Sequence, residues 1–141
     1  MNLEVRDLGR MRFDRAWEIQ KEIHRGVADG REPAHLLLVE HPPVITLGKN
    51  AGTDSLLNPE PWYRERGIDI HRIERGGDVT WHGPGQTVGY WIRKLEGPER
   101  DLHRHLRLIE AALIESLDAL EVTGFRREGY TGVWTEAGKI A

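Results

Sequence analysis

The chain has 141 residues, of which 38% are hydrophobic and 30% charged, and its formal net charge is -3. This balance is typical of a soluble globular protein, and the absence of a basic excess argues against nucleic-acid binding. No apolar run approaches the ~20 residues of a membrane span, and the first residues contain no signal-peptide core. We therefore predict a cytoplasmic protein that contacts neither nucleic acid nor membrane. The chain contains no cysteine, which excludes a disulfide, cysteine-ligated zinc and a cysteine nucleophile within these residues.

The pattern of apolar residues predicts alternating strands and helices in one domain, residues 1–141, of the α+β class. The expected strands are 3–8, 35–40, 44–47, 68–73, a brief strand within 75–86, 87–92 and 130–135, and the expected helices are 13–27, 60–66 and 102–120. Asn58 is the expected cap of the short helix, and Asp101 that of the long one. The apolar stripe of the long helix predicts that it packs on a sheet.

The last three residues, Lys139-Ile140-Ala141, read as the start of a return strand after the turn Glu136-Ala137-Gly138. Native domains seldom end on the opening residues of a hairpin arm, because an unpaired arm leaves backbone donors and acceptors unsatisfied. We therefore expect the chain to be the front part of a longer domain, incomplete at its C-terminus.

A glycine-rich segment carries the clearest chemical signal. Gly76 and Gly77 lack a Cβ atom, so their backbone can approach an acyl or phosphate group closely. Arg75 before them is a candidate to fix a carboxylate, phosphate or carbonyl group. In the strand that follows, alternation gives one face to Val79 and Trp81 and the other to Asp78, Thr80 and His82, so that one face is expected to line an apolar slot.

His82 precedes Gly83-Pro84-Gly85-Gln86, which places an imidazole at a sharp turn. Taken alone, this is more often a turn histidine bonded to backbone. Taken with the preceding residues, the segment Arg75-Gly76-Gly77-Asp78-Val79-Thr80-Trp81-His82-Gly83-Pro84-Gly85-Gln86 resembles the signature of the lipoyl (octanoyl) transferases of lipoate biosynthesis. Supporting similarity lies in residues 37–48, in Thr131-Gly132-Val133-Trp134 and in Lys139-Ile140-Ala141.

The resemblance implies the fold of biotin and lipoate protein ligases, a mixed sheet flanked by helices around an acyl tunnel. It also implies that Arg75 to His82 bind substrate and that Lys139 corresponds to the lysine of a Cys/Lys dyad. The implied reaction moves an octanoyl group from octanoyl-acyl carrier protein to a lysine of a lipoyl domain, in 2-oxoacid dehydrogenase E2 subunits and glycine cleavage H protein. It requires neither ATP nor metal. The resemblance predicts a cysteine that this chain lacks, so we expect the chain itself to be inactive.

Two alternatives stay open. A lipoate protein ligase or amidotransferase relative shares the implied fold but has to form an acyl-adenylate, and a non-catalytic acyl-binding module would keep the pocket without the dyad. Three histidines, His71, His103 and His105, form no recognised metal-ligand pattern, and we predict no metal site.

Overall fold

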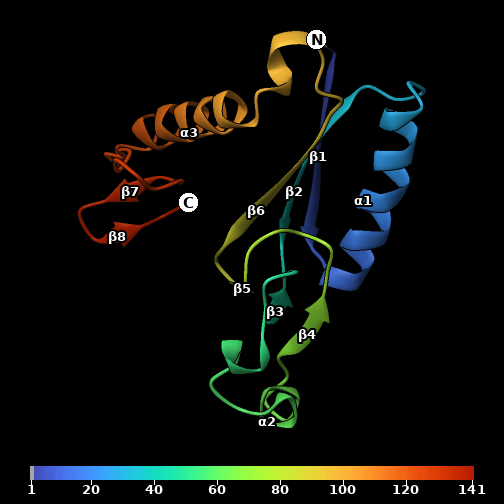
Figure 1. Cartoon of the computed structure of the whole chain (residues 1–141), viewed down its shortest axis with the longest axis vertical. Coiled ribbons are helices and arrows are strands. Elements are labelled where there is room, and N and C mark those ends of the chain that lie inside the picture. The colour runs from blue at the N-terminus through green and yellow to red at the C-terminus, as the bar shows by residue number, and fades with distance from the viewer. Residues whose placement is uncertain (1) are drawn as a thin grey trace. The chain divides into compact units, whose positions relative to one another are not determined.

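The computed structural model describes residues 2–141. The chain divides into two compact units, one up to Lys94 and the other from Leu95 onwards (Figure 1). Mixed strands and helices confirm the predicted α+β class, while the prediction of one domain over residues 1–141 stays a prediction. No helix in the described part of the chain is long and apolar enough to cross a membrane.

The first unit begins with a strand, a crossover helix and a parallel strand: β1 (Leu3–Arg10), α1 (Phe13–Ala28) and β2 (Ala34–Glu40). A helix between two strands is the usual way to make them parallel, since a tight turn can only join antiparallel neighbours. β6 (Thr87–Ile92) pairs antiparallel with β2, which gives the sheet order β1-β2-β6. α1 lies along this sheet (Figure 1), and its Ile23 and Val27 pack with Leu37 in a buried cluster.

A second mixed sheet repeats this plan on a smaller scale. β3 (Val44–Leu47) and β4 (Asp69–Arg72) are parallel, joined through the one-turn helix η1 (Thr53–Ser55) and α2 (Glu60–Arg64). β5 (Val79–His82) pairs antiparallel with β3, so the order is β4-β3-β5. β3 is buried along its whole length because it is the central strand, and its Ile45 and Leu47 pack against Tyr63 of α2. The family resemblance implied one mixed sheet, and this unit contains two mixed sheets of three strands each.

The second unit contains η2 (Gly97–Arg100), α3 (Leu102–Asp118) and a hairpin of β7 (Trp134–Thr135) and β8 (Gly138–Lys139). The predicted cap of α3 is confirmed, because the Asp101 carboxylate accepts a hydrogen bond from the Arg104 N–H at 3.1 Å. The buried residue of this helix is Glu110, whereas apolar residues of the predicted stripe such as Leu102 and Leu106 are exposed. The packing of this stripe on a sheet stays a prediction.

Two local predictions are wrong. The N-cap of α2 is Pro59 and not Asn58, and no side chain caps this helix. The strand expected from Tyr130 starts only at Trp134, because Gly132 has a φ of 121° that breaks the extended backbone before it.

Candidate functional site

The glycine loop, residues 75–78, is organised by the side chain of Arg75. Its Nη2 donates to the Thr46 carbonyl at 2.8 Å and to the Thr46 hydroxyl at 3.0 Å, and its Nη1 donates to the Gly76 carbonyl at 2.9 Å. Nη2 also lies 3.2 Å from the Asp78 carbonyl. Because Thr46 is a buried residue of β3, these bonds tie the loop to the central strand. Arg75, predicted to fix a ligand group, therefore holds the carbonyls of its own loop.

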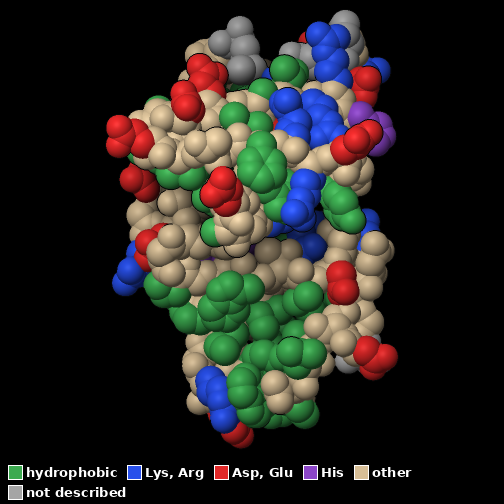
Figure 2. Space-filling model, turned by 90° about the vertical axis from the view of Figure 1, so that its left-hand side faces the viewer, with side chains coloured by type: hydrophobic (Ala, Val, Ile, Leu, Met, Phe, Trp, Pro, Cys, Tyr) green, Lys and Arg blue, Asp and Glu red, His purple; other side chains and the backbone are tan. Residues whose placement is uncertain are grey.

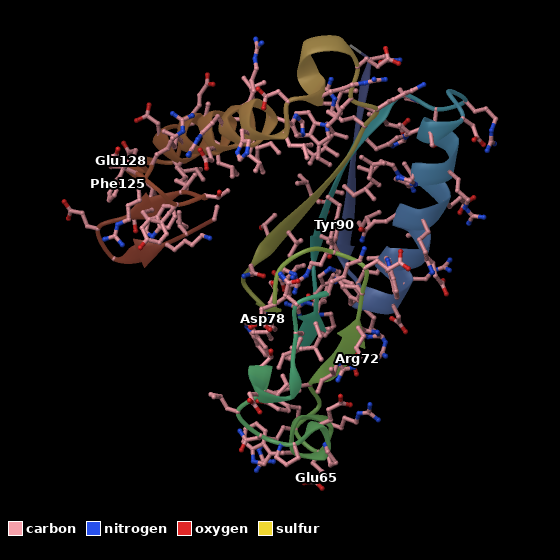
Figure 3. All side chains as sticks on the ribbon, viewed as in Figure 1. Glu65, Arg72, Asp78, Tyr90, Phe125 and Glu128 are labelled. Carbon is pink, nitrogen blue, oxygen red and sulfur yellow. The ribbon has the colours of Figure 1, made fainter. Side chains whose placement is uncertain are left out.

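The chain directly after β3 holds the other side of the glycine loop. The N–H groups of Gly48, Lys49 and Asn50 donate to the carbonyls of Asp78, Arg75 and Gly77 at 2.7, 2.9 and 3.0 Å. Asp78, labelled in Figure 3, also accepts a hydrogen bond from the Ser55 hydroxyl at 2.5 Å. The loop is thus bound through its carbonyl oxygens on both sides.

Close approach of the two segments depends on Gly48. A Cβ atom on Gly48 would lie 2.5 Å from the Gly77 carbonyl oxygen and 2.9 Å from Nη1 of Arg75. Gly77 itself has a φ of 83°, a conformation that glycine adopts without strain. A Cβ atom on Gly76, in contrast, would meet no atom within 4 Å. Open space therefore lies beside Gly76, and closely packed backbone lies beside Gly48.

The N–H groups of Gly76 and Gly77 have no hydrogen-bond acceptor in the part of the chain that the structure describes. The loop carbonyls are all engaged, so the groups it offers to a ligand are donors. Backbone N–H groups in a turn of this kind are suited to a carbonyl oxygen or an anion.

β5 has the two faces that alternation predicts. Val79 and Trp81 are exposed, with 42% and 48% of their surface accessible, whereas Thr80 and His82 are half-buried. Figure 2 shows hydrophobic side chains gathered over the lower part of that view, where β3 to β5 and α2 lie in Figure 1. An apolar strand face turned outward is unusual, and it provides a surface for an alkyl chain next to the glycine loop.

His82 stands at a reverse turn that its sequence explains. The Gln86 N–H donates to the Gly83 carbonyl at 3.1 Å, and Gly85 has a φ of 86°. Pro followed by a glycine with positive φ at the two central positions is the signature of a type II turn. The turn brings the Gln86 amide oxygen to 2.6 Å from Nδ1 of His82, so the imidazole is oriented by its own turn.

A second histidine, His41, lies fully buried beside this turn. Its Nδ1 donates to the Met11 carbonyl at 2.7 Å, and its Nε2 lies 2.9 Å from the hydroxyl of Tyr90 (labelled in Figure 3). Because the Met11 carbonyl can only accept, Nδ1 carries the ring proton, and Nε2 of the neutral imidazole then accepts from the Tyr90 hydroxyl, whose pKa burial raises to about 12. The rings of His41 and His82 have their centroids 5.9 Å apart. Both ring nitrogens of His41 are therefore engaged in hydrogen bonds.

Burial lowers the pKa of His41, the hydrogen bond to the Met11 carbonyl partly opposes this effect, and the nearby His82 lowers the pKa further by a lesser amount. As the pH falls, His41 takes up its proton in the unfolded chain near its ordinary pKa of about 6.5, and in the folded chain only at a lower pH. We expect the free energy of unfolding to be highest above about pH 6.5 and to fall as the pH drops below it, by at most ~1.4 kcal/mol per pH unit from this residue. Urea unfolding of the chain and of His41→Gln between about pH 7.5 and 5.5 measures this contribution.

The difference in stability between the two proteins should shrink as the pH falls, because only the parent chain keeps the buried imidazole. His24→Gln, at an exposed position of α1, is the matched control. A stability difference that stays constant over this range would show that the protonation of His41 is not linked to folding.

Lys139 lies in the second unit, on β8, and pairs in register with Trp134 of β7. Its Nζ lies 5.3 Å from the centroid of the Trp134 ring, within the range of a cation–π contact. Residues 75–82 thus belong to the first unit and Lys139 to the second. That they form one active site stays a prediction.

Two residues that shape the candidate site were given no role by the sequence. Gly48 and His41 both occur in the supporting segment, 37–48, but each lies more than 25 positions from the residues that it contacts in the motif. A histidine between a buried strand and Pro42-Pro43 is the signal that would have drawn attention to His41. In the described part of the chain, no group of three His, Asp or Glu side chains is placed to hold a metal ion.

The sequence matches the lipoyl protein ligase A/B catalytic domain over residues 13–141. It is 46% identical over 139 residues to an octanoyltransferase of Syntrophotalea carbinolica, covering 99% of this chain and 63% of that protein. It is 45% identical over 137 residues to an octanoyltransferase of Geobacter metallireducens, covering 97% and 61%. The chain thus spans about three fifths of the length of these relatives.

Solved structures share the fold at low sequence identity. A bipartite lipoate protein ligase of Thermoplasma acidophilum, studied with its E2 lipoyl domain, aligns with a TM-score of 0.75 at 16% identity, covering 99% of this chain and 53% of that one. The P. falciparum protein LipL1 in complex with lipoate aligns with a TM-score of 0.71 at 14% identity, covering 98% and 42%. The implied ligase-like fold is confirmed, and the chain belongs to the lipoyl protein ligase A/B catalytic domain family.

Proposed function

We propose that this chain is the acyl-binding part of an octanoyltransferase that moves octanoyl from octanoyl-acyl carrier protein to a lysine of a lipoyl domain. The observation that carries the proposal is the pairing of an outward apolar strand face with open backbone donors. Val79 and Trp81 of β5 are exposed beside Gly76 and Gly77, whose N–H groups have no acceptor among the described residues. An octanoyl thioester needs both features, a surface for its alkyl chain and donors for its carbonyl oxygen.

The similar proteins support octanoyl-acyl carrier protein, and not free lipoate, as the substrate. Octanoyltransferases match the chain at 45% and 46% identity, whereas the ligase of Thermoplasma acidophilum matches at 16%. As acceptors we propose the lipoyl domains of 2-oxoacid dehydrogenase E2 subunits and the glycine cleavage H protein, and as location the cytoplasm. No metal or ATP takes part in the proposed reaction.

The proposed reaction has two steps. A cysteine thiolate attacks the thioester carbonyl of octanoyl-acyl carrier protein, which releases the carrier thiol and leaves an octanoyl thioester on the enzyme. The amine of the lipoyl-domain lysine then attacks that thioester, forming an amide and freeing the cysteine. Residues 75–78 would hold the carbonyl oxygen in both steps. As an ammonium, Lys139 would favour the thiolate by its charge and give a proton to the departing carrier thiolate. The neutral amine that remains would then accept a proton from the attacking lysine of the lipoyl domain.

Because the chain has no cysteine, the test uses a chimera in which it is followed by the remaining part of the Syntrophotalea carbinolica octanoyltransferase. With octanoyl-acyl carrier protein and a lipoyl domain, we expect the chimera to transfer octanoyl without ATP. Acylation that requires free lipoate and ATP would instead identify a ligase. Binding of octanoyl without transfer would identify an acyl-binding module.

Within the active chimera, Lys139→Ala should slow formation of the acyl-enzyme at least about a hundredfold, the usual contribution of a positioned acid or base. It should also raise the pH at which iodoacetamide alkylates the cysteine, since a cation beside a thiol favours the thiolate. Lys21→Ala, at an exposed position of α1, serves as the control. If the pH midpoint of cysteine alkylation is the same in the unchanged chimera, in Lys139→Ala and in Lys21→Ala, the proposed role of Lys139 is excluded.

A further inference from the structure

Glu110 is a carboxylate that the sequence places on α3 and the structure buries, with 3% of its side chain exposed. Its Oε2 accepts from Nη1 of Arg107 at 2.7 Å and from Nε of Arg126 at 3.0 Å. Its Oε1 accepts the backbone N–H of Gly132 at 2.9 Å. The Gly132 N–H, followed by the Arg107 guanidinium, lowers the pKa of Glu110, so the carboxylate stays charged at neutral pH.

One oxygen of the Glu110 carboxylate thus binds two guanidinium groups, and the other binds a single backbone N–H group. Arg126 is itself fixed, because its Nη2 donates to the Arg107 carbonyl at 2.9 Å. Because Glu110 and Arg107 both belong to α3, the Glu110 carboxylate ties the Gly132 N–H to this helix. Figure 3 shows Phe125 in the segment that this anchor secures, and Phe125 pairs with Trp134 by a backbone bond of 2.8 Å in each direction.

Gly132 in turn lies against the side chain of Lys139. A Cβ atom on Gly132 would first meet the carbonyl oxygen of Ala141, and would also lie 2.6 Å from Cε of Lys139 and 3.1 Å from its Nζ. Gly132 also has a φ of 121°, which residues with a side chain rarely adopt. On the neighbouring strand, the Trp134 ring lies 5.3 Å from Nζ of Lys139. The end of the Lys139 side chain thus lies between the Trp134 ring and the backbone of Gly132, where a Cβ atom would displace it.

We propose that Glu110 is a positioning residue for Lys139, and that it acts by fixing Gly132, whose bare backbone sets the place of the lysine amine. The inference rests on the proposed function only for the chemical role of the Lys139 amine. Its structural part does not depend on that function, because Glu110, Gly132 and Lys139 all belong to the same compact unit.

The test needs no acyl transfer. Protons above an aromatic ring are shifted upfield, so the ε-methylene protons of Lys139 report on its position over Trp134, while hydrogen exchange of the Gly132 amide reports on the bond to Glu110. In the 141-residue chain, we expect Glu110→Ala to move the Lys139 protons toward their free-chain shift and to speed exchange of the Gly132 amide on the order of tenfold or more. Glu110→Gln keeps an oxygen for the Gly132 N–H and should restore most of both signals.

Glu115→Ala, an exposed glutamate on the same helix, is the matched control and should change neither signal. Gly132→Ala should displace the Lys139 protons while Glu110 is intact, which tests the contact between Gly132 and Lys139. If Glu110→Ala fails to fold, Glu110→Asp, whose shorter side chain weakens the bond to the Gly132 N–H, replaces it and should shift both signals in the same direction. Lys139 shifts that stay unchanged in Gly132→Ala, or in a folded Glu110→Ala with a fast-exchanging Gly132 amide, would overturn the proposal. A chimera that transfers no octanoyl while these shifts respond as expected would overturn the proposed function alone.

Discussion

After incubation with octanoyl-acyl carrier protein, the 141-residue chain should carry no octanoyl group that neutral hydroxylamine releases. The chain has no cysteine, and the labile thioester of the proposed reaction forms only on a thiol. Intact-mass measurement before and after hydroxylamine treatment checks this result. The treatment also separates a thioester from an amide formed on a lysine, because the amide is not cleaved.

The chimera with the Syntrophotalea carbinolica segment provides the positive control, since it should gain a labile octanoyl group under the same conditions. Replacing the cysteine that we propose as its nucleophile by serine should remove that group again. A labile adduct on the 141-residue chain alone would contradict the Cys/Lys mechanism that we propose.

Most strands and helices of this chain follow from local patterns. Phe13 to Ala28 repeats its apolar residues at helical spacing, and Val44 to Leu47 is a continuous apolar run, which is what a central buried strand requires. The errors occur where tertiary structure decides. Asn58 has the chemistry of a cap, yet the helix starts one residue later, at a boundary that local sequence does not fix.

The candidate site was predictable as a linear motif but not as a contact network. Residues 75–82 are contiguous, so the motif can be read from the sequence. The role of Arg75 was not predictable, because its acceptors on Thr46 belong to a strand 29 positions earlier. Glu110 was missed for the same reason: on a helical wheel it is one more charged residue, and its burial depends on Arg126 and Gly132.

The substitution with the largest expected effect on folding of the candidate site is Gly48→Ala. The added Cβ would lie 2.5 Å from the Gly77 carbonyl oxygen, a backbone atom that cannot rotate away as a flexible side chain can. The glycine loop would have to separate from the turn after β3 and lose bonds such as Gly48 N–H to the Asp78 carbonyl. We expect a loss of about 1–3 kcal/mol in the free energy of unfolding, typical of overpacking at a rigid position.

Gly76→Ala is the matched control, because a Cβ atom there meets no atom within 4 Å and no left-handed backbone is required. Its free energy of unfolding should stay unchanged or rise slightly, as the unfolded chain loses conformational freedom. Urea unfolding followed by tryptophan fluorescence compares the two variants. In the chimera, Gly76→Ala should nevertheless reduce octanoyl transfer, since its methyl group occupies the open space that we assign to the acyl group. Equal stability of Gly48→Ala and Gly76→Ala would show that the close contact of Gly48 with the glycine loop does not constrain the fold. Full octanoyl transfer by a folded Gly76→Ala chimera would show that the acyl group binds elsewhere.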